Sequence, residues 1–569
     1  MTLPTTASDP PVSNQADEAL NIATHIVDRH VAAGRGETRA MRFLGNDLDA
    51  TPIDLTYAEL ADASARVATV LRQLGLERGE TVFLLAGRVP RQYVAALATW
   101  KAGGVVCPLF AAFGPEPIRQ RLELGDARIL ITTSSLYRRK ILPIRDRLPF
   151  LRHVLIIDLD APDVPADTLS LGTLTEAVTE PLDAVETRAG DPAILHFTSG
   201  TTGTPKGALH VHEAVESHAS SGVHVLGLQP GDVYWCTADP GWVTGTSYGI
   251  IAPLAVGVGM VVDEAEFDAQ RWFDVLERER VTVWYTAPTA IRMLMRVDVP
   301  ELDLSALRLA FSVGEPLGAQ AAEWGRTALG VPIRDTWWQT ETGSIMIATA
   351  HDGEIRPGSM GTAVAGIDVA LLDCNDVGDL TLVDGRVVEL ADPDRVGMIA
   401  IRPGWPSMFR AYLNAPERYR SAFADGWYLS GDLARRDADG AFWFVGRADD
   451  VIKTAGHLIG PFEVERVLNA HPDVTASGVY GVPDDTAGEV IHAEVVLRDG
   501  VDAEAEDTVR SLRAHARRTL GAALSPRSIT PVATLPITRS GKVMRRLLRA
   551  RALGLPEGDI STLEGGNQS

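Results

Sequence analysis

The sequence has little cysteine. Its three cysteines, Cys107, Cys236 and Cys374, lie far apart and form neither a CxxC pair nor an even set. This usage excludes a disulfide-rich secreted scaffold and indicates a reducing compartment. We therefore expect a cytoplasmic protein.

Long apolar runs are also missing. The longest, from Tyr248 to Val262, is interrupted by glycine and proline and falls short of the roughly 20 residues that span a bilayer. The first 20 residues contain neither the basic nor the apolar segment of a signal peptide. We predict a disordered leader over residues 1–20 and no membrane association.

Positive charge is scarce relative to negative charge. Lys and Arg number 53 against 75 Asp and Glu, so the formal net charge is -22. This charge repels nucleic acids and anionic membrane surfaces. The one basic run, between Arg539 and Arg551, is typical of a solvated helix face. We expect small-molecule partners and no nucleic-acid partner.

The composition that remains is that of a packed chain. Apolar residues make up 45% and charged residues 22% of 569 residues, a length that predicts more than one domain. From about Leu55 onward, apolar runs alternate with amphipathic segments, as in TVFLLA from Thr81 followed by QYVAALATWKAGG. The alternation predicts an α/β fold with largely parallel strands, and ligands at their carboxyl ends.

The pattern changes after about residue 350. Short β-type runs such as VALLD, GMIAIR and GAFWFVGR are separated by Gly and Asp turns, which predicts a β-rich subdomain over residues 350–448. A helix, two strands and a further helix follow the GRADD segment. We predict an N-terminal domain over residues 21–448, with two α/β layered subdomains and a small β-barrel. A smaller, mobile α+β lid domain would cover residues 449–569.

A loop rich in hydroxyls and glycine separates two apolar segments, AILHF and ALHV. It reads TSGTTGTPKG from Thr198 to Gly207. Glycines let backbone N–H groups approach an anion, hydroxyls donate hydrogen bonds, and Lys206 supplies a positive charge, so the loop can surround a phosphate. It lacks the Gly-Lys-Ser/Thr end of a Walker A loop. A flexible linker can have this composition, but linkers do not usually join two apolar strands directly.

With this loop the chain resembles the acyl-adenylate-forming superfamily, and within it the acetyl-CoA synthetases (AMP-forming acetate–CoA ligases). The resemblance extends over nearly the whole chain because further motifs occur in the family's order. These are WCTADPGWVTGTSYG from Trp235, SVGEPL from Ser312, DTWWQTETG from Asp335, GWYLSGDLARRD from Gly426, GRADDVIKTAG from Gly446 and TRSGKVMRR from Thr538.

The resemblance implies a ligase that uses ATP, Mg²⁺ and coenzyme A. A carboxylate would attack the α-phosphorus of ATP, releasing pyrophosphate and leaving acyl-AMP, and CoA would then displace AMP. Both steps place negative charge on phosphate or carbonyl oxygens, which fixed donors and cations stabilise.

The resemblance also implies residues that bind the nucleotide. Glu341 would hold Mg²⁺, since a hard cation prefers carboxylate oxygen, and it would act in catalysis with Thr198 and Lys206. Asp432 would accept the ribose hydroxyls, and Arg447 would reach the ribose or a phosphate. The other contacts to ATP or AMP would come from Ser199, Gly200, Thr201, Thr202, Gly203, Gly314, Glu315, Pro316, Asp335, Thr336, Trp337, Gln339 and Thr340.

Lys542 matches the family's adenylation lysine, which bridges the attacking carboxylate and the α-phosphate. Asp449 matches the hinge about which the C-terminal domain rotates, and this rotation would withdraw Lys542 after adenylation. Acylation of Lys542 by a lysine acyltransferase, reversed by a deacylase, would remove its charge and switch the enzyme off. For CoA we assign Arg517 and Gly456.

The acyl pocket indicates the substrate. By resemblance, its walls are Val243, Thr244, Val313 and Trp338. Medium-chain relatives carry a small residue, often glycine, where this chain has Trp338, and an indole fills the space that a longer chain needs. We predict acetate, with leakage to propionate, because one methylene changes binding by only about 1–3 kcal/mol. The alternative is a medium-chain or aryl acid–CoA ligase.

Three histidines form an HxHx5H pattern that suggests zinc: His210, His212 and His218. No cysteine or further ligand has metal-site spacing nearby, so we interpret them as structural residues.

One position departs from the family. The segment after the hinge reads Gly-His/Tyr-Arg-Ile/Leu-Gly in the family but GHLIG here, with Leu458 in place of the arginine. Loss of a charge-assisted contact costs about 1.5–3 kcal/mol. A weakly active nucleotide-binding homologue is therefore a second alternative, although the retention of Lys542, Asp432 and the phosphate loop favours an active enzyme.

Overall fold

A computed structural model describes residues 16–198, 205–375, 379–448, 450–454, 457–484, 488–502, 506–520, 525–538, 542–557, 560 and 563. Contacts divide the chain into two compact units. Over their described residues, the first comprises Met1–Gly200, Thr204–Pro357 and Pro403–Ser421, and the second comprises Thr201–Gly203, Gly358–Arg402 and Ala422–Ser569. No helix in the described ranges is long and apolar enough to cross a membrane.

One sheet of the first unit contains the strands on either side of the phosphate loop. In spatial order it consists of β21 (Ala411–Tyr412), β9 (Lys206–Val211), β8 (Pro192–Thr198), β4 (Val105–Pro108), β3 (Thr81–Leu85), β5 (Ile129–Thr132), β6 (His153–Ile156) and β7 (Leu169–Ser170). The strands from β8 to β7 pair in parallel, whereas β9 is antiparallel to both its neighbours. The predicted parallel α/β layer is therefore present, and it ends in an antiparallel hairpin.

The second sheet of this unit carries the motifs that begin at Trp235, Ser312 and Asp335. Its order is β15 (Ile347–Ala348), β14 (Ile333–Trp337), β13 (Leu309–Val313), β12 (Val283–Thr286), β10 (Val233–Cys236), β11 (Gly259–Asp263), β1 (Arg39–Leu44) and β2 (Ile53–Thr56). The strands from β14 to β1 are parallel, so their carboxyl ends share one edge of the sheet. As expected for α/β sheets, the motif residues follow these strand ends.

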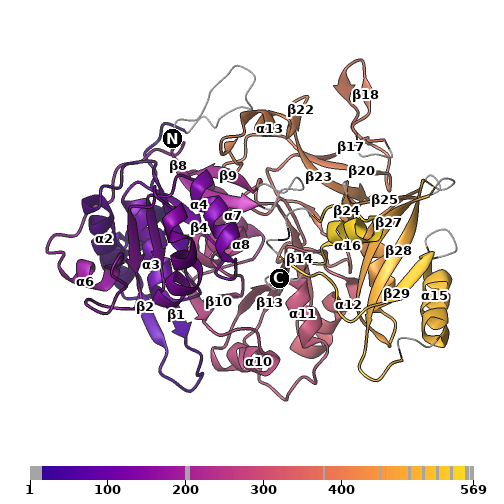
Figure 1. The fold of residues 1–569 in the computed structure, drawn as a ribbon, viewed down its shortest axis with the longest axis horizontal. Coiled ribbons are helices and arrows are strands. Elements are labelled where there is room, and N and C mark those ends of the chain that lie inside the picture. Colours follow the sequence, from indigo (N-terminus) through magenta and orange to yellow (C-terminus); the bar gives the residue numbers. More distant parts are fainter. Residues whose placement is uncertain are drawn as a thin grey trace. The chain divides into compact units, whose positions relative to one another are not determined.

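Helices lie beside both sheets (Figure 1). They are α1 (Arg29–Ala32), α2 (Tyr57–Gln73), α3 (Pro90–Lys101), α4 (Pro115–Leu124), α5 (Ser134–Leu136), α6 (Leu171–Glu176), α7 (Ala214–His224), α8 (Val243–Thr246), α9 (Ala252–Val256), α10 (Ala269–Arg278), α11 (Pro288–Leu294), α12 (Ala319–Trp324) and α13 (Pro416–Arg420). Wider or tighter helical turns span Thr24–Asp28, Tyr137–Ile141, Leu142–Arg147, Ser247–Ile251 and Gly325–Leu329. Helix α2 begins with a capping box, in which Thr56 and Glu59 satisfy each other's backbone N–H groups.

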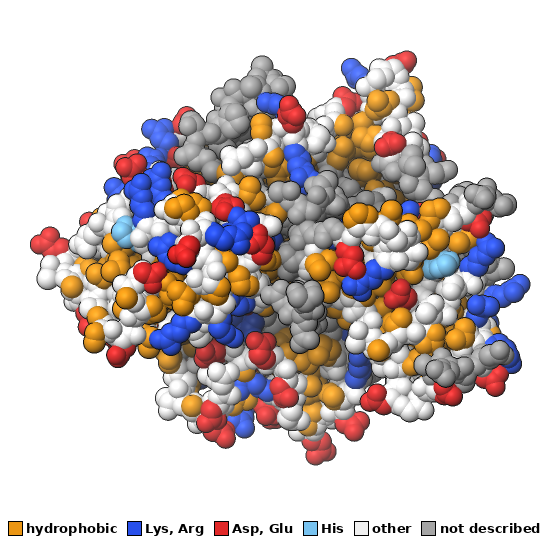
Figure 2. Space-filling view, viewed as in Figure 1, with side chains coloured by type: hydrophobic (Ala, Val, Ile, Leu, Met, Phe, Trp, Pro, Cys, Tyr) orange, Lys and Arg blue, Asp and Glu red, His pale blue; other side chains and the backbone are white. Residues whose placement is uncertain are grey.

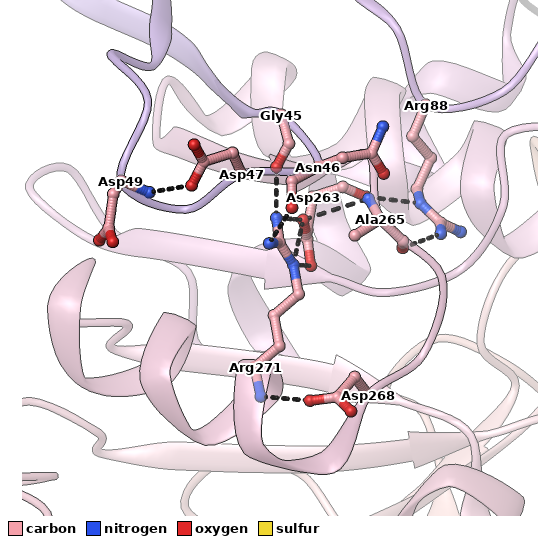
Figure 3. Close-up of polar contacts among 9 residues, drawn as sticks. All are labelled: Gly45, Asn46, Asp47, Asp49, Arg88, Asp263, Ala265, Asp268 and Arg271. Carbon is pink, nitrogen blue, oxygen red and sulfur yellow. Dashed lines mark hydrogen bonds and ion pairs between the residues drawn. The ribbon is translucent and has the colours of Figure 1, made fainter.

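Arginines tie together the loops that follow β1 and β11 (Figure 3). The Arg271 guanidinium donates to both carboxylate oxygens of Asp263 and to the Gly45 and Asn46 carbonyls. Arg88 donates to the Asp263 and Ala265 carbonyls at 2.7 and 2.8 Å. Guanidinium groups that satisfy several carbonyls in this way hold adjacent strand ends rigid.

Each sheet of the first unit has its own apolar core. Phe83, Leu130 and Tyr137 belong to one cluster, and Trp235 and Trp284 belong to the other. Each fully buried large apolar side chain contributes about 1.5–3 kcal/mol, so these clusters stabilise the layers that position the motifs.

The second unit begins with an antiparallel sheet over the β-rich segment. It contains β17 (Val369–Leu372), β20 (Val396–Ile401), β23 (Trp427–Arg436), β22 (Phe423–Ala424) and β24 (Phe442–Arg447). Further strands are β16 (Thr362–Ala363) and the paired β18 (Leu382–Val383) and β19 (Arg386–Val387). The runs VALLD, GMIAIR and GAFWFVGR are thus strands, as predicted.

The remainder of the second unit is an α+β arrangement with its own core around Val464 and Leu512. Its strands are β26 (His457–Ile459), β25 (Ile452–Thr454), β28 (Gly488–Leu497), β27 (Val474–Asp484) and β29 (Ser528–Pro531). Its helices are α14 (Pro461–Asn469), α15 (Glu506–Leu520) and α16 (Arg545–Leu553). The expected large N-terminal α/β part and smaller C-terminal α+β part are both present, while the exact boundary at residues 448 and 449 stays a prediction.

Acidic and basic side chains are interleaved over the face shown in Figure 2. Several arginines pair with carboxylates of other elements, as Arg42 does with Asp54 and Glu279. Exposed ion pairs such as Arg42–Asp54 contribute little to stability, typically about 0–1 kcal/mol each. The three cysteines are thiols and form no disulfide.

Candidate active site

The two ends of the phosphate loop lie opposite each other. Thr198 ends β8, Lys206 begins β9, and the two residues are direct partners in the antiparallel register. Register partners have Cα atoms about 4.5–5.5 Å apart, so both side chains stand at the mouth of the same hairpin. The other loop residues that we predicted lie outside the described residues: Ser199, Gly200, Thr201, Thr202 and Gly203.

A tyrosine connects Lys206 with Glu341. The Lys206 ammonium lies 5.5 Å from the centroid of the Tyr412 ring, within cation–π range. The Tyr412 hydroxyl donates to Glu341 Oε1 over 2.7 Å, and the Phe409 N–H donates to the Glu341 carbonyl over 3.0 Å. Two predicted residues thus share one neighbour, Tyr412, that sequence analysis missed. No local pattern marks Tyr412, because its contacts come from a two-residue strand paired with a distant segment.

Asp335 is a buried carboxyl with several donors. Ser312 Oγ donates to Oδ1 over 2.6 Å, the Thr336 N–H donates to the same oxygen over 3.0 Å, and the Leu317 N–H donates to Oδ2 over 3.3 Å. Burial raises the pKa of Asp335 to about 7, although these three donors oppose the shift. Asp335 therefore links β14 to the turn after β13.

That turn is the predicted Gly314–Glu315–Pro316 segment. Gly314 has φ +90°, a backbone conformation that favours glycine. The Glu315 carboxylate accepts from Thr289 Oγ1 over 2.7 Å and pairs with Arg292 at 2.5 Å. Both partners belong to α11, so the turn is fixed to a helix, and Arg292 is a further cation that sequence analysis missed.

Trp338 directly follows β14 and is half-buried, whereas Trp337 is buried. Its indole Nε1 donates to the Tyr285 hydroxyl over 3.2 Å. The Tyr248 ring meets the indole edge-on, with centroids 5.1 Å apart. Gln339 and Thr340, which follow Trp338, are half-buried.

The other predicted pocket residues come from two neighbouring segments. Val313 is buried at the end of β13 and is the register partner of Thr336 on β14. Val243 and Thr244 open α8, which leads into the turn that carries Tyr248. Gly245 in α8 is required there, since a Cβ would lie 2.0 Å from the Asp239 carbonyl oxygen.

In the second unit, Asp432 and Arg447 form a pair. They are register partners on β23 and β24, and Arg447 Nη1 lies 3.5 Å from Asp432 Oδ1. Asp432 is buried and Arg447 is largely exposed. The structure therefore brings together the two residues that we predicted at the ribose.

Lys542 is exposed, and its backbone is paired with Thr538. The Thr538 N–H donates to the Lys542 carbonyl over 2.7 Å, and the Lys542 N–H donates to Thr538 Oγ1 over 3.0 Å. Helix α16 starts three residues later with Arg545, which donates to both carboxylate oxygens of Glu465 at 2.7 and 2.6 Å. Glu465 is buried on α14, so this bidentate pair anchors the helix that follows Lys542.

The remaining predicted residues of the second unit are less informative. Asp449 and Gly456 lie outside the described residues. Leu458 is in β26 and pairs in register with Lys453. Arg517 is exposed in the last turn of α15.

The three histidines of the HxHx5H pattern are buried and bond to the backbone. His210 Nδ1 lies 2.9 Å from the Ser407 carbonyl, and His218 Nε2 lies 2.8 Å from the Gly343 carbonyl. The Ile22 N–H donates to His212 Nδ1 over 3.1 Å. Burial lowers the pKa of each ring to about 4.

Comparison with known proteins adds the family. The sequence model described as "AMP-binding enzyme" matches residues 28–413, and that described as "AMP-binding enzyme C-terminal domain" matches residues 463–542. The acetyl-coenzyme A synthetase of Bacillus subtilis is 41% identical over 550 residues, which cover 96% of this chain and 93% of that protein. The acetyl-coenzyme A synthetase of Streptomyces coelicolor is 38% identical over 590 residues, covering 98% and 87%.

Solved structures share the fold. The anthranilate CoA ligase AuaEII in complex with anthranoyl-AMP is 29% identical, with a TM-score of 0.83 over 94% of this chain and 98% of that one. The acyl-CoA synthetase of Brucella canis is 32% identical, with a TM-score of 0.70 over 95% and 96%.

Proposed function

Because the chain belongs to the AMP-binding enzyme family, we propose that it is an ATP-dependent acyl-CoA synthetase that activates acetate. The near-full-length match to several acetyl-coenzyme A synthetases carries this proposal. Acetate attacks the α-phosphorus of ATP, pyrophosphate leaves, and the acetyl group is held as acetyl-AMP. The CoA thiol then attacks the acetyl carbonyl, and AMP leaves as acetyl-CoA forms.

The phosphate loop would hold the β- and γ-phosphates. Its role is supported by the opposed positions of Thr198 and Lys206, which supply a hydroxyl and a positive charge at one place. Charge develops on phosphoryl oxygens in the first step, so a fixed cation there lowers the barrier. The loop residues between them would donate backbone and hydroxyl hydrogen bonds: Ser199, Gly200, Thr201, Thr202 and Gly203.

Glu341 would hold Mg²⁺. Its carboxylate fits a hard cation, because it is half-buried and one of its oxygens is fixed by the Tyr412 hydroxyl. Mg²⁺ usually takes one or two carboxylates together with phosphate oxygens and water, so a single glutamate is sufficient protein ligation. When bound, the ion would neutralise charge on the ATP phosphates.

Two groups of residues would contact the nucleoside. The Gly314–Pro316 turn and the segment from Asp335 to Thr340 would line the adenine side and reach the α-phosphate. Asp432 would accept from the ribose hydroxyls, since a carboxylate is acceptor-only, and Arg447 would assist it. The 3.5 Å approach of the Asp432 and Arg447 side chains supports a shared role.

Lys542 would bridge the acetate carboxylate and the α-phosphate during adenylation. Its exposure three residues before α16 supports a side chain that can reach a ligand. A domain of residues 449–569 would rotate about Asp449 against residues 21–448 between the two steps. Arg517 and Gly456 would contact CoA.

Lysine acylation would regulate the enzyme. Only five residues of the chain are lysines: Lys101, Lys140, Lys206, Lys453 and Lys542. Lys101 is buried against Asp28, whereas Lys542 is exposed, so an acyltransferase would find the catalytic lysine accessible. Its acylation would abolish the positive charge, and a deacylase would restore it.

Trp338, with Val243, Thr244 and Val313, would limit the acyl pocket to two or three carbons. This argues against a medium-chain or aryl acid ligase, whose substrate needs the space that the indole fills.

The test is ATP–pyrophosphate exchange with acetate, propionate, butyrate and benzoate, repeated with CoA to follow thioester formation. We expect exchange to be fastest with acetate and about 10–200-fold slower with propionate, and we expect no exchange with benzoate. Faster exchange with butyrate or benzoate than with acetate would overturn the proposal. Trp338→Gly serves as the matched variant and should move the preference toward butyrate.

A further inference from the structure

Trp338 is held by a directed chain of hydrogen bonds. Its Nε1 donates to the Tyr285 hydroxyl over 3.2 Å. That hydroxyl lies 2.8 Å from Thr336 Oγ1, which donates to the Ser312 carbonyl over 2.7 Å. An indole N–H can only donate and a carbonyl can only accept, so the two hydroxyls between them must point the same way. The Tyr285 hydroxyl therefore donates to Thr336 and accepts from the indole.

The other side of the indole is fixed by packing. Tyr248 meets Trp338 at an interplanar angle of 68° and Tyr285 at 81°, with centroids 5.1 and 5.6 Å apart. Tyr248 is itself immobilised, because its hydroxyl accepts from the Ile345 N–H over 2.8 Å and lies 2.8 Å from Ser221 Oγ. Burial raises the pKa of Tyr248 and Tyr285, so both remain neutral at physiological pH.

We infer that Tyr285 is a positioning residue for acyl-chain selectivity, whose hydroxyl keeps the Trp338 indole across the end of the acyl pocket. This rests on the proposed function, in which Trp338 walls that pocket. An indole that turned away to admit a longer chain would leave its N–H without its buried acceptor, which is unfavourable. Tyr285 thus determines which acyl-chain length the pocket accepts. It does so although it lies on β12, two strands away from β14 in the sheet.

Tyr285→Phe tests the inference, because it keeps the ring and removes the acceptor. We measure kcat and KM for acetate, propionate and butyrate. The ratio of kcat/KM for propionate to that for acetate should rise about fivefold, mainly through a lower KM for propionate, because the indole can then move aside. Turnover with acetate at saturation should stay within about twofold, and the thermal midpoint reports folding.

Tyr234→Phe is the control. Tyr234 lies on the adjacent strand β10, two residues before Cys236, the register partner of Tyr285, so it faces the same side of the sheet. Its buried hydroxyl meets the Cys236 side chain and takes no part in the hydrogen-bond chain from Trp338 to Ser312. The acid preference of this variant should match that of the unmodified protein.

A double-mutant cycle separates positioning from a general structural role. Trp338→Phe removes the N–H donor, so Tyr285→Phe should cause no further change in acid preference in that background. An equal shift in both backgrounds, or no shift in Tyr285→Phe alone, would overturn the inference. The proposed function fails differently: acetate-dependent exchange would be absent, or Trp338→Gly would leave the preference unchanged.

Discussion

At the scale of single residues, the predicted site contains charged groups that each have a defined neighbour. Lys206 lies over an aromatic ring, Glu341 accepts from a tyrosine, and Arg447 approaches a buried aspartate. Lys542, like Arg447, is exposed. A cation that must approach and leave its ligand within one catalytic cycle suits an exposed, flexible stem.

Lys542→Ala is therefore expected to abolish acetate-dependent ATP–pyrophosphate exchange. It should still convert supplied acetyl-AMP and CoA to acetyl-CoA at a rate within about threefold, because the second step does not need this charge. Arg551→Ala is the control. It removes an exposed cation that lies on α16 and should leave both half-reactions unchanged. Equal loss of both half-reactions in Lys542→Ala would contradict the assigned role.

Leu458→Arg restores the family's cation after the hinge. We expect pyrophosphate exchange to become about tenfold faster or more, since a charge-assisted contact to phosphate contributes about 1.5–3 kcal/mol. Leu458→Met, which adds no charge, is the control. If the exchange rate is the same with arginine as with leucine, the departure from the family has no effect on adenylation. The hypothesis of a weakly active nucleotide-binding homologue is then unsupported.

At the scale of elements, the short strand β21 connects two parts of the predicted site. Tyr412 is the register partner of Ala208 on β9, which places its ring beside Lys206 and its hydroxyl on Glu341. A two-residue strand thus joins the phosphate hairpin to the segment after β14. Glu341 keeps its orientation through this contact, and its affinity for Mg²⁺ should depend on it.

Tyr412→Phe tests this connection. The ring and its contact with Lys206 remain, but the hydrogen bond to Glu341 is lost. We expect the Mg²⁺ concentration for half-maximal exchange to rise about 10-fold, as for loss of an outer partner of a metal ligand. Tyr419→Phe is the matched control, because the Tyr419 hydroxyl meets the Phe409 carbonyl at 3.5 Å. An unchanged Mg²⁺ dependence in Tyr412→Phe would refute the role of Glu341.

At the scale of the whole molecule, buried histidines make the first unit sensitive to acid. Burial lowers the pKa of His210, His212 and His218 to about 4, and that of His196 further below its usual value. Between pH 6.5 and 4 the unfolded chain binds protons at these rings that the folded chain does not. The contribution of the neutral rings to the free energy of unfolding is complete above pH 6.5. Below pH 6.5, the free energy of unfolding falls by about 1.4 kcal/mol per pH unit for each ring.

Three carboxyls oppose this trend, since desolvation also raises the pKa of Glu216. Burial raises the pKa of Asp335 to about 7 and that of Asp239 to about 6, so the folded chain binds these protons first and gains stability as the pH falls. The four rings, together with His25, whose pKa burial also lowers to about 4, outweigh these three carboxyls. We therefore expect the thermal midpoint to fall between pH 6.5 and 4.5.

The measurement is thermal unfolding at pH 7.5, 6.5, 5.5 and 4.5. His218→Gln should reduce the fall, whereas His224→Gln, an exposed ring on the same helix α7, should not. A midpoint that is constant or rises toward pH 4.5 would show that the buried rings do not control acid stability.

The sequence by itself determined the elements, the order of the motifs and the class of reaction. Strands β3, β5 and β24 follow from runs of neighbouring apolar residues, and the phosphate loop follows from ten consecutive residues. Short segments of sequence are enough to recognise these features, because strand burial and loop chemistry depend on adjacent side chains. The family resemblance then assigned residues such as Lys542 and Asp432 to roles through position alone.

Only the tertiary structure decided which distant side chains meet. Tyr412 and Glu341 are 71 residues apart in the chain, and Trp338 and Tyr285 are 53 apart, yet both pairs are hydrogen-bonded. The shifted pKa of Asp335 likewise arises from burial between two strands and not from its neighbours in sequence. Such contacts depend on sheet order and register, which no single segment encodes, because they arise only when separate elements pack together.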